Sequence, residues 1–439
     1  MTDIIETPDV SEEIIDREAP SPLDVPGLIR LLVVLSLIVG TFFLFGAQDL
    51  LLVIAALMFM VLFHELGHFA TAKWSGMKVT QYFVGFGPRL WSMRRGETEY
   101  GVKAIPAGGY VRIIGMTSAE EVHPSDEPRA YRNQAFPKRI LVASAGSFMH
   151  FVLAFVLAFL ALTLIGRPDA SVVTVQSYLN LGPTVMTPAQ KAGLQPGDRI
   201  VSVNGIKVTS DAVLTNAVGN NVNKPITITV EKNGITKTKT ITPLDGRTVS
   251  LNGAPLAPKD GPAKGFVGVQ LAEGTTTVSP LNAIVQSGSV VRQAAVGAVT
   301  GITHLFSPTG LTNYARAVAN PPTASSPAAA QASRPESIIG AVRTATQGVQ
   351  AGMLTFVEVF ISINIFIGVI NMLPMLPLDG GHVVIAAYEW IRTRKGTPRY
   401  QADVTKMMPV VYAFVGLLLI LVVSSMYLDV THPAANPFR

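Results

Sequence analysis

The chain of 439 residues contains no cysteine. Disulfide bonds and thiolate metal ligands are therefore excluded, which leaves histidine and carboxylate as the ligands expected for zinc. Charged residues are also scarce, at 14% of the chain, whereas soluble domains carry about a quarter. Together with 49% hydrophobic residues, this composition predicts a membrane protein with soluble parts. The chain is too long for one compact domain, so several modules are expected.

Basic residues exceed acidic ones, giving a net charge of +5. Binding to nucleic acid is one explanation for such an excess. However, the positive charge gathers beside apolar runs, where membrane topology explains it better. We therefore expect the lipid bilayer, and no nucleic acid, as a partner.

Five apolar segments are long enough to be candidates for membrane spans. They cover residues 28–46, 49–73, 139–166, 353–390 and 408–428. Basic residues outnumber acidic ones by eleven to six over residues 73–139, and by five to two over residues 389–406. By the positive-inside rule both loops face the cytoplasm. The N-terminus is then cytoplasmic, and the stretch between the third and fourth spans is outside the cytoplasm of a multi-pass protein of the cell membrane.

The remaining stretches differ in composition. Residues 1–27 are polar and acidic and lack a basic start, which predicts a disordered cytoplasmic tail and not a signal peptide. Strand-like alternation predicts β-structure elsewhere. The expected parts are a cytoplasmic or membrane-associated β-element and loop at 74–138, a β-rich domain at 171–276, and a helix with a Pro/Ala-rich linker at 277–352.

The most informative motif is His64-Glu65-Leu66-Gly67-His68, at the end of an uncharged apolar run. On a helix, the two imidazoles share one face, where both can ligate one zinc ion. Glu65 lies beside them and can act as a general base. Ionisable residues at membrane depth are costly and usually functional. The motif therefore predicts a zinc hydrolase site at or within a bilayer.

A catalytic zinc ion needs a third protein ligand. Glu97 and Glu99 are one choice, but they lie in a charged, strand-like stretch on the cytoplasmic side. Asp379 is the better candidate, because it follows Pro374 and Pro377, which interrupt an apolar segment. Irregular backbone at membrane depth is tolerated where it is buried in protein or lines a cavity, so this break indicates a site.

Taken together, these motifs resemble the site-2 protease family of intramembrane zinc metalloproteases. The resemblance is strongest to the bacterial enzymes of regulated intramembrane proteolysis, of actinobacterial type. It rests, in family order, on the motif at 64–68, the run 83–88, the segment 104–111, a PDZ-like module around 192–205, and Leu378-Asp379-Gly380. It implies one zinc ion per chain, held by His64, His68 and Asp379, with Glu65 as catalytic base. It also implies that Asn371 holds the substrate backbone or the oxyanion.

The implied fold is a polytopic α-helical membrane protein of about five spans, with a membrane-associated β-element and one extracytoplasmic PDZ-like, β-rich domain. Gly85, Gly87, Gly108 and Gly109 suit a strand that binds an extended substrate by edge pairing. Simple turn formation is the alternative role for these glycines. Implied substrates are membrane proteins with a single transmembrane span, such as anti-sigma factors or remnant signal peptides, after a first cut by an upstream site-1 protease.

The chain departs from the family at two places. The first span, 28–46, is additional, and Ser147 and His150 stand where proline and asparagine are more common. The alternative function is a catalytically idle, PDZ-bearing membrane scaffold or chaperone, which has no need of a complete ligand set and base. A membrane zinc transporter would carry polar pairs in more spans than this chain does. The predicted function is that of a zinc metalloendopeptidase.

Overall fold

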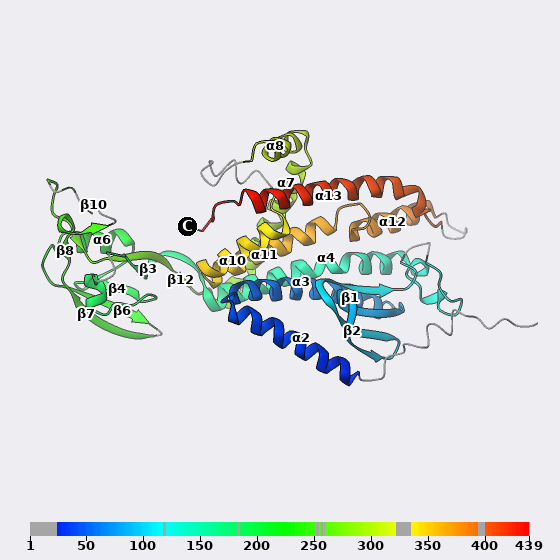
Figure 1. The fold of residues 1–439 in the computed structure, drawn as a ribbon, viewed down its shortest axis with the longest axis horizontal. Helices are drawn as coiled ribbons and strands as arrows, with labels where there is room; N and C mark the ends of the chain where they lie inside the picture. The colour runs from blue at the N-terminus through cyan, green and yellow to red at the C-terminus, as the bar shows by residue number, and fades with distance from the viewer. Residues whose placement is uncertain are drawn as a thin grey trace, which may run out of the picture. The chain divides into compact units, whose positions relative to one another are not determined.

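The computed structural model describes residues 24–116, 120–181, 185–232, 234–251, 254–255, 258, 260–321, 335–393 and 400–438. Of the predicted acidic tail, residues 1–23 lie outside the described residues. The chain divides into two compact units, the first made of Met1–Ala158 with Gln286–Arg439 and the second of Phe159–Val285. Figure 1 shows their elements.

Within the described residues, five helices are long and apolar enough to cross a membrane. They are α2 (Val25–Leu44), α3 (Gln48–Trp74), α4 (Phe136–Leu160, continued by a π-helical turn to Ile165), α11 (Met353–Asn371) and α13 (Met408–Thr431). Large apolar side chains such as Leu37 and Ile420 are exposed on these helices. Lipid, and not water, is the environment that such exposed surfaces favour.

The segment 353–390, predicted as one span, consists of two helices. Helix α11 ends at Asn371, and α12 (Asp379–Arg392) begins after a break that contains Pro374 and Pro377. The bounds of the single span 353–390 are therefore corrected, whereas the interruption at the two prolines is as expected, because proline lacks a backbone N–H and its ring clashes with the preceding turn. Asp379 consequently stands in the first turn of a new helix.

A β-hairpin lies between α3 and α4 in the chain, within the predicted β-element 74–138. Its strands are β1 (Val79–Arg95) and β2 (Thr98–Ile113), paired antiparallel with several register shifts. A Cβ added at Gly109 would lie 3.3 Å from Glu65 Cγ, so strand β2 passes directly beside Glu65 on α3. Short 3₁₀ turns at Glu127–Arg129 and Tyr131–Asn133 lead from the hairpin region to α4.

Three helices occupy the described part of 277–352: α7 (Pro280–Leu305), α8 (Pro308–Ala319) and α10 (Ile338–Ala351). The prediction of a linker is therefore corrected at α8, and residues 322–334 lie outside the described residues. Ser307 caps α8 by accepting the Gly310 N–H at 3.0 Å. The Tyr314 hydroxyl donates to the Leu421 carbonyl of α13 at 3.2 Å, which gives this short helix a packing partner.

The second unit is β-rich, as predicted for 171–276. Its six-stranded sheet has the order β12-β3-β4-β6-β7, and β5 pairs with β4. Asn204 and Gly205, with φ of 50° and 78°, form the turn between β4 and β5. The elements are β3 (Arg167–Tyr178), α5 (Pro188–Lys191), β4 (Arg199–Val203), β5 (Ile206–Lys207), α6 (Asp211–Gly219), β6 (Ile226–Lys232), β7 (Ile235–Ile241) and β12 (Val269–Thr276), with the short pairs β8 (Leu244–Asp245) to β11 (Gly265–Phe266) and β9 (Ser250–Leu251) to β10 (Ala254–Pro255).

A buried ion pair joins α4 to α12 in the first unit. Arg139 Nη1 lies 2.5 Å from Glu389 Oε2, and the two side chains are 4% and 8% exposed. Glu389 also accepts the Ala402 N–H at 2.7 Å, and the Arg139 guanidinium lies over the Tyr131 ring. Removing one partner of a buried ion pair costs about 3–5 kcal/mol, because the other charge is left unpaired, so loss of either side chain is expected to loosen the contact of α12 with α4.

Candidate metal centre

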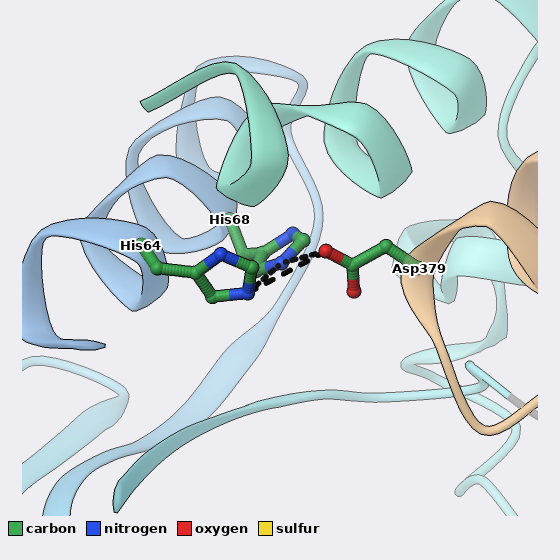
Figure 2. A group of neighbouring side chains, drawn as sticks. All are labelled: His64, His68 and Asp379. Atoms are coloured by element: carbon green, nitrogen blue, oxygen red, sulfur yellow. Dashed lines mark hydrogen bonds and ion pairs between the residues drawn. The ribbon is translucent and has the colours of Figure 1, made fainter. Parts of the chain in front are cut away.

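Helices α3 and α12 place three ligand-type side chains together (Figure 2). His64 and His68 are buried and lie one turn apart on α3, and Asp379 is the first residue of α12. The separations are 3.2 Å between the two Nε2 atoms, 3.3 Å from His68 Nε2 to Asp379 Oδ2, and 3.4 Å from His64 Nε2 to the same oxygen. Three donor atoms therefore converge on one point.

The triangle has the dimensions of a zinc site. Tetrahedral zinc bound at about 2.0–2.2 Å places any two of its ligand atoms roughly 3.3–3.6 Å apart. His68 Nδ1 lies 2.8 Å from the Val142 carbonyl oxygen, which can only accept. The Nδ1 atom therefore carries the hydrogen, and the lone pair of Nε2 faces the other two ligands. The residues present fit the ion in type, number and spacing.

Helix α4 packs against the two imidazoles at Gly146. A Cβ added at Gly146 would lie 2.7 Å from His64 Nε2 and closer still to His68 Nε2. A Cβ added at Gly67 of α3 would lie 2.7 Å from the Ala145 carbonyl oxygen of α4. Two glycines thus let α3 and α4 approach closely enough for the α4 backbone to pass beside the imidazoles. Ser147 follows Gly146, and its hydroxyl oxygen lies 3.5 Å from Asp379 Oδ2.

Of the predicted substrate-binding residues, Gly109 lies nearest to Glu65. Gly85 and Gly108 have positive φ, and a Cβ at Gly85 would lie 2.7 Å from the Ile105 carbonyl oxygen across the hairpin. This close approach of β1 and β2 is sufficient to explain glycine at position 85. A Cβ at Gly87 would contact the Ile105 side chain. Substrate binding by these glycines stays a prediction.

Asn371 is the last residue of α11, half-buried at the start of the break that leads to Asp379. Its side chain makes no hydrogen bond to the residues that the structure describes. The structure does not gather it into the metal group, whose members are His64, His68 and Asp379. Its proposed contact is with substrate.

The two rejected carboxylates lie outside the metal group and have other partners. Glu97 binds Lys73 at 2.6 Å and Arg129 at 2.6 and 2.8 Å. These hydrogen bonds, those of the Arg129 guanidinium first, lower the pKa of Glu97 to about 2. Glu99 lies 3.1 Å from Arg89. Their rejection as ligands agrees with the structure.

Sequence reasoning did not identify Gly146 or the Val142 carbonyl as parts of the site. The available signal was the run of small residues 143–147 inside an otherwise bulky apolar segment. Small residues let membrane helices approach closely. Which helix they approach is a tertiary property that the run itself does not indicate.

Comparison with known proteins decides the family. The model of Peptidase family M50 matches residues 52–416. The chain belongs to peptidase family M50. It is 33% identical over 415 residues to zinc metalloprotease Rip1 of Mycobacterium tuberculosis, covering 88% of this chain and 96% of the relative. Zinc metalloprotease Rip1 of Mycolicibacterium smegmatis is 32% identical over 428 residues, covering 90% and 98%.

Membership of this family confirms the resemblance to site-2 proteases, the enzyme class and the zinc cofactor. The protein is a multi-pass membrane zinc metalloprotease of the site-2 type, whose substrates are membrane proteins. The PDZ-like identity of the second unit stays a prediction.

Proposed function

We propose that the protein hydrolyses peptide bonds within or near transmembrane segments, using one zinc ion held by His64, His68 and Asp379 and Glu65 as general base. The observation that carries this proposal is the triangle of donor atoms with sides of 3.2–3.4 Å at the end of an apolar helix. When bound, zinc polarises the scissile carbonyl and makes a water molecule acidic near neutral pH.

The chain's own residues supply the proton transfers. The Glu65 carboxylate takes a proton from the attacking water and later gives it to the leaving amine nitrogen, so that the peptide C–N bond breaks. The Val142 carbonyl holds His68 in the tautomer that directs Nε2 toward the centre. Burial of the imidazoles restricts bulk water around them.

A peptide bond in a membrane helix is shielded by the hydrogen bonds of the helix itself. We propose that the substrate segment unwinds and pairs as a strand with the hairpin, where β2 passes beside Glu65. Gly109 has no side chain to separate the paired backbone from the carboxylate. This arrangement delivers an extended peptide to the general base.

The test of the proposed function is Glu65→Gln in the full chain, purified and placed in liposomes with a single-span substrate. Glutamine keeps the shape of the side chain but cannot take the proton, so cleavage is expected to fall by about 10²–10⁴-fold. Zinc content, measured on the same sample, is expected to stay at one ion per chain. Cleavage at the wild-type rate by Glu65→Gln would refute the role of Glu65.

Asn371→Leu is expected to slow turnover by about 10²–10³-fold without releasing zinc. The Asn371 amide lies at the end of α11 and is free to hold the substrate backbone or the developing oxyanion, whereas leucine offers no hydrogen bond. Single-turnover cleavage and metal analysis on one preparation measure both quantities. Near-normal cleavage would leave Asn371 only a structural role.

We further propose that the substrates have a single transmembrane span and have already been cut outside the membrane by a site-1 protease. The basic loops 73–139 and 389–406 support a cytoplasmic N-terminus and an extracytoplasmic second unit. Anti-sigma factors and remnant signal peptides are substrates of this kind. A folded domain outside the membrane is then suited to act as a filter, because it can obstruct substrates whose external part is still bulky.

Deleting residues 168–275 tests the filter. Arg167 and Thr276 are paired neighbours on β3 and β12, so a short Gly/Ser bridge can join them without strain. The shortened enzyme is expected to keep zinc and to cleave an untrimmed substrate that the full chain leaves intact. Cells expressing either enzyme with a trimmed and an untrimmed substrate provide the comparison. A stable, zinc-loaded variant that still requires trimming would contradict the filter.

A further inference from the structure

His150 on α4 and Asn364 on α11 form a polar pair inside the apolar core of the first unit. They are 2% and 0% exposed. The Asn364 Nδ2 group donates to the His150 carbonyl at 2.7 Å, so its Oδ1 is the atom that lies 2.6 Å from His150 Nδ1. His150 Nδ1 therefore carries the hydrogen. Polar groups at membrane depth are costly and mark functional positions.

The His150 ring fills the space between α11 and the metal centre. On one side, a Cβ added at Gly368 of α11 would lie 2.7 Å from His150 Cβ and 3.4 Å from its Cδ2. On the other side, the His64 ring lies with its centroid 5.0 Å away at an angle of 46°. Contact therefore runs from α11 through His150 to His64.

The two imidazole ligands are held in different ways. His68 is anchored by the hydrogen bond from Nδ1 to the Val142 carbonyl. His64 Nδ1 is buried and has no partner within hydrogen-bond geometry among the residues that the structure describes, although the Gly146 backbone lies beside the ring. Outer hydrogen bonds normally orient histidine ligands, and His64 has no anchor as short as that of His68, so packing contributes more to its orientation. The groups that pack against its ring include Gly146 and His150.

We propose that His150 is a positioning residue for His64 through the packing of its ring, and that Asn364 supplies the hydrogen-bond partner that the polar His150 ring needs inside the apolar core. The proposal rests on the ligand role of His64 proposed above. Without the His150 ring, the His64 side chain can rotate more freely. Zinc binding must then restrict this rotation, which lowers the affinity for zinc. Loss of an outer-shell partner commonly weakens metal binding by about 10–100-fold, and we expect an effect of this size.

The experiment measures zinc affinity of the full chain in detergent by competition with a chelator of known affinity. His150→Ala is expected to bind zinc about 10–100-fold more weakly than the wild type. The double variant His150→Phe with Asn364→Ala restores a ring at position 150 and removes both polar partners. It is expected to recover most of the lost zinc affinity. A double variant as weak as His150→Ala would overturn packing by the ring as the cause.

Leu153→Ala is the matched control, because Leu153 lies three residues further on α4, is 5% exposed and belongs to a core cluster with Phe356 and Phe360 of α11. It opens a cavity among the same helices and should lower the thermal stability of the metal-free protein without weakening zinc binding. If Leu153→Ala weakened zinc binding as much as His150→Ala, or if His150→Ala did not weaken it, His150 would have no specific role in positioning His64. His64→Ala is measured alongside: if it retained zinc, the proposed ligand set would fail instead.

Discussion

Asp379→Ala is expected to lose bound zinc and all proteolysis. Asp379 supplies the third ligand atom beside His64 and His68. Without it, the two imidazoles fill only half of the four positions of a tetrahedral zinc ion. His64→Ala and His68→Ala should have the same effect. Metal analysis of each purified variant, together with cleavage of a single-span substrate in liposomes, measures both losses.

Glu65→Gln is the control for these variants, because it changes a charged neighbour of the ligands without removing a ligand. If Asp379→Ala bound zinc with unchanged affinity, the assignment of the third ligand would be wrong. His382, one turn further along α12, would then be the next residue to test.

Gly146→Ala is expected to abolish zinc binding by the addition of one methyl group. The new Cβ would collide with Nε2 of His64 and of His68, the atoms that must face the metal. Alanine favours a helix over glycine by about 1 kcal/mol, so helix α4 itself should not be weakened. The variant should therefore fold and insert in the membrane while zinc content and cleavage are lost.

Gly40→Ala is the matched control for Gly146→Ala. Gly40 lies in the membrane-spanning helix α2, and a Cβ added there meets no atom within 4 Å. This variant should bind zinc and cleave substrate as the wild type does. A zinc-loaded, active Gly146→Ala protein would show that α3 and α4 separate readily, contrary to the close packing at Gly67 and Gly146.

The three members of the candidate metal group could be predicted, because each has a recognisable local pattern in the sequence. His64 and His68 are spaced by one helical turn, and Asp379 follows a proline break in an apolar segment. The helix α8 left no such trace, since its composition resembles a linker. It packs through Tyr314 on α13, a contact across 107 residues of chain. Composition alone cannot indicate such a contact.

The surroundings of the ligands escaped prediction for the same reason. Gly146 is one of 38 glycines in the chain. It matters because a side chain at this position would collide with the His64 and His68 imidazoles of another helix. His150 drew attention as a departure from the family pattern, but its partner Asn364 is 214 residues away. Periodicity describes one helix at a time, whereas these contacts depend on how helices pack together.

The ion pair between Arg139 and Glu389 has a consequence for how the protein is made. The partners are 250 residues apart, so the charge of Arg139 is not neutralised by Glu389 until 250 further residues have been made. At about 5–20 residues per second, this interval lasts roughly 12–50 seconds. Asp379 emerges only ten residues before Glu389. A nascent chain therefore lacks the proposed zinc site until Asp379 has been added, long after His64 and His68.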